Sequence, residues 1–309
     1  MIDLQASAQT KPPVFIVADT IKVILNPLSG AAKQAKVEQA LRRAALNYHV
    51  EVTQYRGHAI ELARQAALEG WPLIVAAGGD GTVSEVVNGL MQAAGDGVAG
   101  TLGILPLGTA NDLAAALNLP QNLAAACQRL QAGQTRLIDV GQVNGRYFVN
   151  NSAVGLEPLV TMAYEKIGWI KGTPRYLVAA LQCIWRATPW HMQVAWNQSQ
   201  YDGPITLVSV GNTRRTGGMF YLTPQAQPND GYLDFVYAGQ LSRTQLFRLL
   251  PQTLKGSHIA TPHVVYRRTA ALSITAATPT PIQADGEIID LAATTIHYRI
   301  LPGKLRLLV

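Results

Sequence analysis

The sequence has only two cysteines and no hydrophobic run long enough to cross a bilayer. A spanning helix needs about 20 consecutive apolar residues, and the first twenty residues also lack the apolar core of a signal peptide. Cys127 and Cys183 lie in apolar, helix-like segments, which favours buried free thiols over a disulfide or a metal site. We therefore expect a protein of a reducing compartment that is neither secreted nor embedded in a membrane.

Several common ligand-binding signatures are also missing. No Gly-Lys-Ser/Thr closes a P-loop, and the turn at Gly78, Gly79 and Gly81 does not have the dinucleotide spacing G-x-G-x-x-G. No His/Cys spacing fits a zinc site. The sequence has no helix-turn-helix, zinc-finger or aromatic RNA-binding signature, so we expect no nucleic-acid partner.

The net charge of +6 comes entirely from the second half of the chain. Through Gly155 there are eleven Lys and Arg against eleven Asp and Glu, and from Leu156 onward there are fourteen against eight. This excess, interleaved with tryptophans, predicts transient contact with an anionic membrane; the alternative is an ordinary solvated face with core tryptophans. The residues concerned are Lys166, Lys171, Arg175, Arg214, Arg215, Arg267 and Arg268, with Trp169, Trp185 and Trp190.

A glycine-rich turn after an apolar run is the strongest local pattern. Residues 73–77 predict a strand buried on both faces, and Gly78, Gly79 and Gly81 then let the chain turn sharply. Thr82 and Glu85 have capping-box spacing, which predicts a helix N-terminus beside the turn. Free N–H groups at such a terminus bind anions, so the pattern indicates a phosphate site; a tight connection that binds nothing is the alternative.

Two further junctions of the same kind occur in the first third of the chain. Strand-like residues 22–25 end in Asn26-Pro27-Leu28-Ser29-Gly30, and residues 101–106 lead through Pro106-Leu107-Gly108 to a helical run at 113–117. Ligands of parallel sheets bind beyond the carboxyl ends of the strands. We therefore expect the three turns to line one crevice.

The pattern changes near residues 139–151, from alternating strands and helices to short strand-like runs. Helical stretches remain at 176–185 and 243–250, and turns are expected at 197–198 and 202–204. We predict an N-terminal tail (1–20), an α/β domain (21–140) and a β-rich domain (141–302).

Five motifs in one order resemble a known family. They are Asn26-Pro-x-Ser-Gly, Gly78-Gly-Asp-Gly-Thr, Pro106-Leu-Gly-Thr-Ala-Asn-Asp, Tyr221-x-x-Pro-x-Ala-x-x-x-Asp230-Gly-x-Leu-Asp, and Ala284-Asp-Gly-Glu287. From about Ile21 to Val309 the chain resembles the diacylglycerol kinase catalytic-domain family, in its bacterial lipid-kinase branch, which is similar to sphingosine and ceramide kinases. The resemblance implies a parallel-sheet α/β domain, a mainly β domain built as a β-sandwich, and an active site in the cleft between them. It also implies that residues 303–309 return to the first domain, which would be the nucleotide-binding domain (21–140 plus 303–309). The second domain (141–302) would then be the lipid-substrate domain.

The resemblance assigns a role to each motif. The positions that it implies for ATP are Asn26, Thr53, Gly78, Gly79, Asp80, Gly81, Thr82, Val83, Ser84 and Thr109. Glu287 is implied as the general base, Asp285 as a residue that assists it or binds metal, and Asp80 as the carboxylate for the magnesium of the nucleotide, directly or through water. A second Mg²⁺ is implied at Asp230, with backbone carbonyls of Gln227 and Tyr232.

We therefore predict an ATP- and Mg²⁺-dependent lipid kinase that acts most simply on diacylglycerol. It would work in the cytoplasm, peripherally at the inner membrane face, and a homodimer is left open. The alternatives are a soluble kinase of the NAD kinase type, which shares Gly-Gly-Asp-Gly, and a pseudokinase that senses lipid or nucleotide. The acyl pocket, and hence the choice of lipid, is not encoded in any readable motif.

Overall fold

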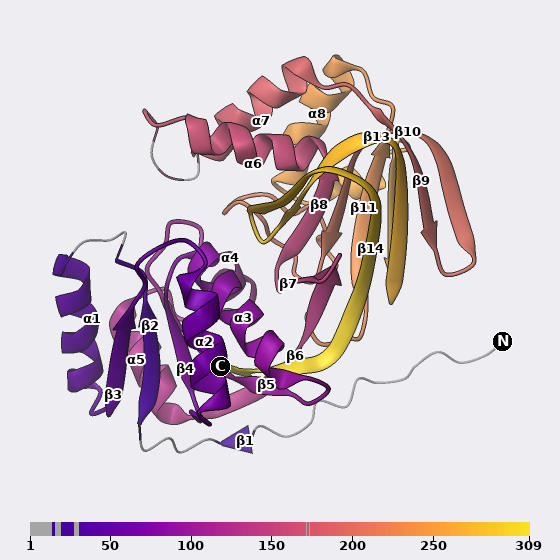
Figure 1. Ribbon diagram of the computed structural model, residues 1–309. Coiled ribbons are helices and arrows are strands. Elements are labelled where there is room, and N and C mark those ends of the chain that lie inside the picture. The colour runs from indigo at the N-terminus through magenta and orange to yellow at the C-terminus, as the bar shows by residue number, and fades with distance from the viewer. Residues whose placement is uncertain (1–13, 16–19, 28–30, 171, 173) are drawn as a thin grey trace.

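The computed structural model describes residues 14–15, 20–27, 31–170, 172 and 174–309. Figure 1 shows two lobes, an α/β lobe and a strand-rich lobe, connected by strands that pass from one to the other. Ser29, Gly30 and Lys171, which the sequence analysis used, lie outside the described residues, as does most of the predicted tail. Within that tail, β1 (Val14–Phe15) pairs with β6 (Gln134–Val143).

The first lobe is built on a parallel sheet in the order β5-β4-β2-β3. Its strands are β2 (Ile21–Leu25), β3 (Tyr48–Val52), β4 (Ile74–Gly78) and β5 (Ala99–Pro106). Its helices are α1 (Ala31–Arg43), α2 (His58–Leu68), α3 (Asp80–Ala94), α4 (Asp112–Ala116) and α5 (Leu123–Ala132).

Both faces of this sheet are buried. Alternate side chains of one strand enter different cores, so that Val23 packs with α1 and α5 while Ile24 packs with α2 and α3. Strands covered on both faces read as continuous apolar runs. This explains why residues 73–77 are apolar throughout, and it confirms the α/β fold predicted for this part of the chain.

The second lobe is a β-sandwich whose layers share two long strands. β10 (Ser199–Gly211) pairs with β9 (Trp190–Trp196) through its first half and with β8 (Asn151–Gly155) through its second. β13 (Ala271–Ala284) does the same, pairing first with β9 and then with β8. The remaining strands are β7 (Arg146–Phe148), β11 (Leu233–Gly239), β12 (Val264–Thr269) and β14 (Glu287–Leu308).

Three helices cover the outer face of the sandwich (Figure 1). They are α6 (Leu156–Lys166), α7 (Pro174–Arg186) and α8 (Arg243–Thr253), followed by the short η2 (Ser257–Ala260). The sequence analysis predicted α7 and α8 but did not predict α6. Pro158 lies in the first turn of α6, where its missing N–H costs no helical hydrogen bond.

Two smaller predictions can be compared with this fold. A turn was expected at Asp202-Gly203-Pro204, and this is wrong, because all three residues lie within β10 and pair with β9. Neither β8 nor β11 reaches this half of β10, and a strand with an unpaired edge tolerates proline. Cys127 in α5 is buried, Cys183 in α7 is half-buried, and both thiols are free.

β14 connects the two lobes. Its first part pairs with β13, and its last part pairs antiparallel with β6 and parallel with β5 of the first sheet. The residues after Gly303 therefore complete the sheet on which the glycine-rich turn is built.

Candidate active site

The glycine-rich turn joins β4 to α3, as expected, but the helix begins earlier than predicted. Gly79 is the N-cap residue and Asp80 the first residue of α3, so the predicted capping box of Thr82 and Glu85 is wrong. The Glu85 carboxylate instead accepts hydrogen bonds from Gly57 N (2.9 Å) and Ala59 N (3.2 Å) at the start of α2. The N–H groups at the first turn of α3 are therefore left to face the crevice.

The three strand-end turns meet at one edge of the sheet. Asn26 Nδ2, after β2, donates to Thr82 Oγ1 in the first turn of α3 (3.1 Å). Gly79 and Gly108 pack backbone against backbone, so closely that a Cβ added to Gly108 would lie only 2.5 Å from Gly79 Cα. Asn111 braces the third turn by accepting from Gly108 N (3.0 Å). Together the turns form a cradle of backbone groups at the carboxyl ends of β2, β4 and β5.

The remaining predicted nucleotide positions differ in what they offer. Thr109 lines the cavity in front of the cradle, whereas Thr53 is buried, with its N–H bonded to Leu25 O (2.9 Å). Val83 packs in the core and its N–H bonds to Gly79 O (3.1 Å); Ser84 is buried as well. The buried side chains of Thr53, Val83 and Ser84 therefore support the turn from the interior of the domain.

Glu287 faces the cradle from the other lobe. Asp285 and Gly286 form the tight turn between β13 and β14, both with positive φ (48° and 81°), and Glu287 starts β14. Its Oε1 lies so close to Gly81 that a Cβ added there would be 3.9 Å away. Arg146 Nη2 donates to Glu287 Oε2 (2.7 Å), and Arg56 Nε lies 3.7 Å from Oε1.

The two arginines and burial act on Glu287 in opposite directions. Burial raises the pKa of Glu287 above its usual range, and the positive charges of Arg146 and Arg56 limit the rise. A carboxylate with a raised pKa is a better proton acceptor at neutral pH. Glu287 therefore combines the position and the basicity that a general base requires.

Asp285 is buried, and both its oxygens are occupied. Oδ2 accepts from Val149 N (2.9 Å), and Oδ1 accepts from Asn150 N (2.8 Å) and Asn151 N (3.2 Å). Burial raises the pKa of Asp285 to about 7, although these three N–H groups favour its ionised form. The contacts tie the turn that carries Glu287 to the start of β8.

A second pair of carboxylates, Asp80 and Asp112, lies beside the cradle, and Asp80 lines the same cavity as Gly81 and Thr109. Asp80 Oδ1 accepts from Asp112 N (2.6 Å) at the start of α4, and both Asp112 oxygens accept from Gly218 N (3.0 and 3.1 Å). Arg215 Nε lies 3.3 Å from Asp112 Oδ1. Burial, together with the nearby charge of Asp80, raises the pKa of Asp112 to about 7, and burial also raises the pKa of Asp80. A cation placed beside this pair would be favoured electrostatically.

The predicted second metal loop lies elsewhere, near the crossing of β14 between the lobes. Asp230 Oδ1 accepts from Tyr232 N (3.0 Å), and its Oδ2 is ion-paired with Arg268. The neighbouring Asp139 accepts from Gly231 N and Gly303 N (2.7 Å each). Gln227 is exposed and Tyr232 is 47% exposed. Within the described residues, no three His, Cys, Asp or Glu side chains group closely enough to hold a metal ion between them.

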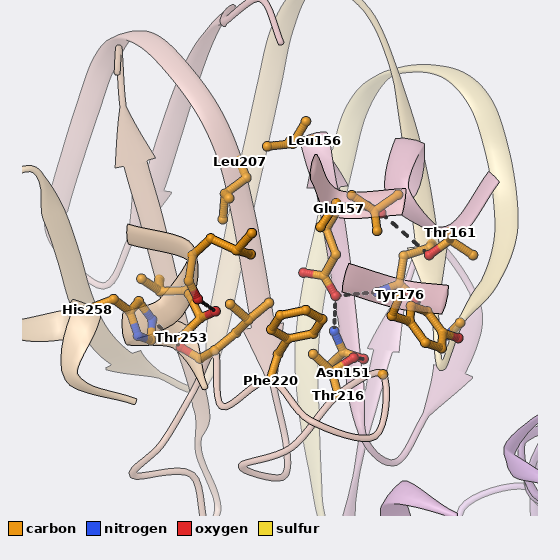
Figure 2. Close-up of a pocket in the computed structure, with 18 of the residues that line it drawn as sticks. Asn151, Leu156, Glu157, Thr161, Tyr176, Leu207, Thr216, Phe220, Thr253 and His258 are labelled. Carbon is orange, nitrogen blue, oxygen red and sulfur yellow. Dashed lines mark hydrogen bonds between the residues drawn. The ribbon is translucent and has the colours of Figure 1, made fainter. Parts of the chain in front are cut away.

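Two adjoining cavities meet at the carboxylates of Asp80 and Asp285. A polar cavity of about 300 Å³ lies between the lobes and is lined by Gly81, Thr109 and Glu287, among others. A narrower, mostly apolar cavity of about 160 Å³ begins at Asp285 and Asp112 and extends between the sandwich and its helices. Figure 2 shows the side chains that line it, with Phe220 near the centre and Leu207 and His258 toward the far side.

Four charged residues of the site were not among the sequence predictions: Arg56, Asp112, Arg146 and Glu157. Asp112 could have been singled out, because it closes a motif that was recognised. Arg56 and Arg146 meet Glu287 from segments far away in the sequence, and nothing local marks them. Glu157 lies in the helix that was missed.

Comparison with known proteins agrees with this architecture. Residues 20–143 match the family described as diacylglycerol kinase catalytic domain, and residues 151–309 match the YegS C-terminal NAD kinase beta sandwich-like domain. A diacylglycerol kinase of Bacillus subtilis is 32% identical over 272 residues, covering 86% of this chain and 89% of that protein. The chain belongs to the diacylglycerol kinase family. A diacylglycerol kinase of Staphylococcus carnosus is 28% identical, with coverages of 86% and 88%.

Solved structures of similar proteins share the fold of this diacylglycerol kinase family member. A crystal structure of a Bacillus anthracis diacylglycerol kinase superposes with a TM-score of 0.72 at 20% identity, covering 95% of this chain and 97% of that one. A second Bacillus anthracis structure reaches 0.78 at 24% identity. The family, the lipid-kinase class of enzyme and the two-domain fold predicted from the sequence are thus confirmed. Among the described residues, no helix is both long and apolar enough to cross a membrane.

Proposed function

We propose that this lipid kinase transfers the γ-phosphoryl group of ATP to a lipid hydroxyl, and that diacylglycerol is the simplest substrate. One observation carries the proposal: the Glu287 carboxylate lies against Gly81 of the backbone cradle, in a cavity that adjoins an apolar one. Phosphoryl transfer needs the phosphates, the acceptor hydroxyl and a proton acceptor in one place. The relatives named diacylglycerol kinase support the choice of lipid.

In this reaction the residues of the cradle bind the phosphates, and the turn at Asp285 supplies the proton acceptor. N–H groups of Gly79 to Thr82 bind phosphate oxygens at the start of α3, where the helix dipole favours negative charge. Glu287 takes the proton of the lipid hydroxyl. The oxygen of that hydroxyl bonds to the γ-phosphorus, and the bond between the γ-phosphorus and the ADP oxygen breaks. Arg56 and Arg146 lie where they can balance the charge of the phosphates. Asp285, with both oxygens engaged by backbone N–H groups, positions Glu287.

Asp80 is the proposed carboxylate for the nucleotide's magnesium, which would neutralise charge on the transferred group. Around the Asp80–Asp112 pair, the described residues provide no group of three His, Cys, Asp or Glu side chains that could hold a metal ion by themselves. This suits Mg²⁺, because it takes few protein ligands and keeps several waters. We propose the second Mg²⁺ site at Asp230 as a structural one, and Arg268 would have to release the Asp230 carboxylate for the ion to bind.

Replacing Asp80 by Asn should weaken magnesium-dependent ATP binding by about tenfold, because the amide keeps an acceptor for Asp112 N but loses the charge that attracts the cation. Calorimetric titration of ATP with and without Mg²⁺ measures this. The magnesium dependence should shrink in the variant, and equal dependence in both proteins would remove Asp80 from the metal site.

The covering helices are the proposed membrane-contact surface, and the enzyme would bind peripherally at the inner face from the cytoplasm. Trp169, before α7, is 79% exposed, and Trp185 in α7 is 63% exposed. The guanidinium of Arg243 lies 5.6 Å from the Trp185 ring centroid. Exposed tryptophans beside cations suit the interface of an anionic bilayer.

Replacing Trp169 and Trp185 together by Ala should lower binding to phosphatidylglycerol-containing vesicles by about tenfold, as measured by co-sedimentation. Tyr55 on the first lobe is 54% exposed, and its replacement by Ala is the matched control with no expected effect. An equal loss in both variants would argue against this surface.

The function itself is tested by a panel of lipids in mixed micelles with labelled ATP, assayed beside NAD. Incorporation of label into a lipid hydroxyl supports the proposal, and label in NAD alone would favour the NAD kinase alternative. Absence of any transfer would support the pseudokinase alternative, against which the retained Asp80, Asp285 and Glu287 argue.

A further inference from the structure

Tyr176 is a polar residue without an assigned role at the place where the two cavities meet. It lies in the first turn of α7, and it lines both the polar cavity between the lobes and the apolar cavity. Figure 2 shows it at the end of the apolar cavity opposite His258. Asp80 and Asp285 line both cavities as well, so Tyr176 is part of the wall where one cavity passes into the other.

The ring of Tyr176 is held in place by two contacts. It stacks on the ring of Tyr164, with ring centroids 3.9 Å apart and an angle of 16° between the planes. Gly217 lies so close that a Cβ added to it would be 3.4 Å from Tyr176 Cδ1. The position of the hydroxyl is therefore fixed before any ligand binds.

The hydroxyl of Tyr176 is accessible and unpaired. It forms no hydrogen bond with the described residues. Its oxygen is also not fully enclosed by protein atoms, unlike the buried, unpaired hydroxyl oxygen of Ser84. A ligand in either cavity can therefore reach this hydroxyl.

The other hydroxyl groups on the wall of the apolar cavity already have acceptors within the protein. They belong to three threonines, which donate as follows: Thr161 Oγ1 to Glu157 O (3.4 Å), Thr216 Oγ1 to Asn151 Oδ1 (3.0 Å) and Thr253 Oγ1 to Leu250 O (2.6 Å). Burial raises the pKa of Tyr176, and the charges of Asp112 and Asp80 raise it further. Tyr176 therefore keeps its proton at neutral pH and offers a hydrogen-bond donor that the protein does not use.

A lipid in the site must pass Tyr176. If its hydroxyl lies at Glu287 and its chain enters the apolar cavity, the part that joins the two lies where the cavities meet. In a diacylglycerol this part is a carboxylic ester, whose carbonyl oxygen is a good hydrogen-bond acceptor. In an ether lipid the same part has no carbonyl group.

We propose that Tyr176 is a specificity-determining residue, whose hydroxyl donates a hydrogen bond to the carbonyl oxygen of an ester or amide beside the phosphorylated hydroxyl of the lipid. The inference rests on the proposed lipid kinase function and narrows its substrate class to lipids that carry this carbonyl. An ether lipid excludes water from the Tyr176 hydroxyl without giving it an equal acceptor. A site that hydrogen-bonds one group of a substrate discriminates against the analogue that lacks it.

The test compares dioleoylglycerol with dioleylglycerol, its diether analogue without carbonyl groups, in the same mixed micelles. The preference ratio is kcat/KM for the ester divided by kcat/KM for the ether, and it should be about fivefold or more in the wild type. Tyr176→Phe removes only the hydroxyl and keeps the ring that stacks on Tyr164. The preference ratio should fall by about fivefold to tenfold in this variant.

Tyr201→Phe is the matched control, because Tyr201 lies in β10 of the same lobe and lines neither cavity. It should keep the wild-type preference ratio. Tyr176→Phe should also keep the wild-type Tm and the wild-type affinity for ATP, since its hydroxyl bonds to no described residue and is assigned to the lipid. These two measurements separate a contact with the lipid from a structural role and from a contact with the nucleotide.

An unchanged preference ratio in Tyr176→Phe overturns the inference, and with both lipids still phosphorylated it leaves the proposed function standing. A loss of ATP affinity with an unchanged ratio would assign the hydroxyl to the phosphates instead. A wild-type ratio near one contradicts the inference without the use of any variant. Failure of the wild-type protein to phosphorylate any lipid overturns the proposed function as well.

Discussion

Replacing Glu287 by Gln should reduce turnover by about 10²- to 10⁴-fold while ATP binding stays within about twofold, because the amide keeps the shape but cannot take a proton. The contact of Glu287 with Gly81 comes from the opposite lobe, so the phosphate cradle itself is untouched by the change. Single-turnover transfer to a lipid and calorimetric ATP binding measure the two effects separately.

Glu69→Gln is the matched control for Glu287→Gln, since Glu69 is an exposed carboxylate at the end of α2, away from the cavity. It should behave as the wild type in both measurements. Turnover of Glu287→Gln close to the wild-type rate would show that another group receives the proton. A parallel loss of ATP affinity would point instead to a role for Glu287 in holding the arginines.

Replacing Gly108 by Ala should lower ATP affinity by about tenfold to a hundredfold and the free energy of unfolding by about 1–3 kcal/mol. The new Cβ would lie 2.5 Å from Gly79 Cα, a backbone atom that cannot move aside without opening the cradle. The two turns would separate, and the N–H groups of α3 would no longer face the same point. ATP titration and chemical denaturation measure the two losses.

Gly168→Ala is the control for Gly108→Ala, because a Cβ at Gly168 would meet no atom within 4 Å and the residue has no positive φ. It should leave stability and ATP affinity unchanged. If Gly108→Ala bound ATP as well as this control, the close packing of the two turns would not be needed for nucleotide binding.

The grouping of the three strand-end turns could be predicted, because the carboxyl ends of parallel strands share one edge of the sheet. Strands 22–25, 73–77 and 101–106 are marked by apolar runs and glycine-bearing turns, and the structure has β2, β4 and β5 there with small shifts of their ends. Such local patterns set which segments form elements and where their ends lie.

The contacts across the site could not be predicted, because they depend on how distant segments pack. Glu85 has the spacing of a capping box for its own helix but binds the start of α2 instead. Arg146 and Glu287 are separated by 141 positions and meet only when the sandwich has formed. The helix α6 was not predicted, although proline is compatible with the first helical turn, where Pro158 lies.

β14 runs for 22 residues, starts at the proposed base and ends in the parallel sheet of the first lobe. The whole second lobe must therefore be synthesised before β5, which pairs with β4 on one side, gains β14 on the other. Until then the edge of β5 that β14 will cover is open to wrong partners, because an unpaired strand edge readily adds another chain. Deleting residues 305–308 should accordingly damage the first lobe, although these residues follow the second lobe in sequence.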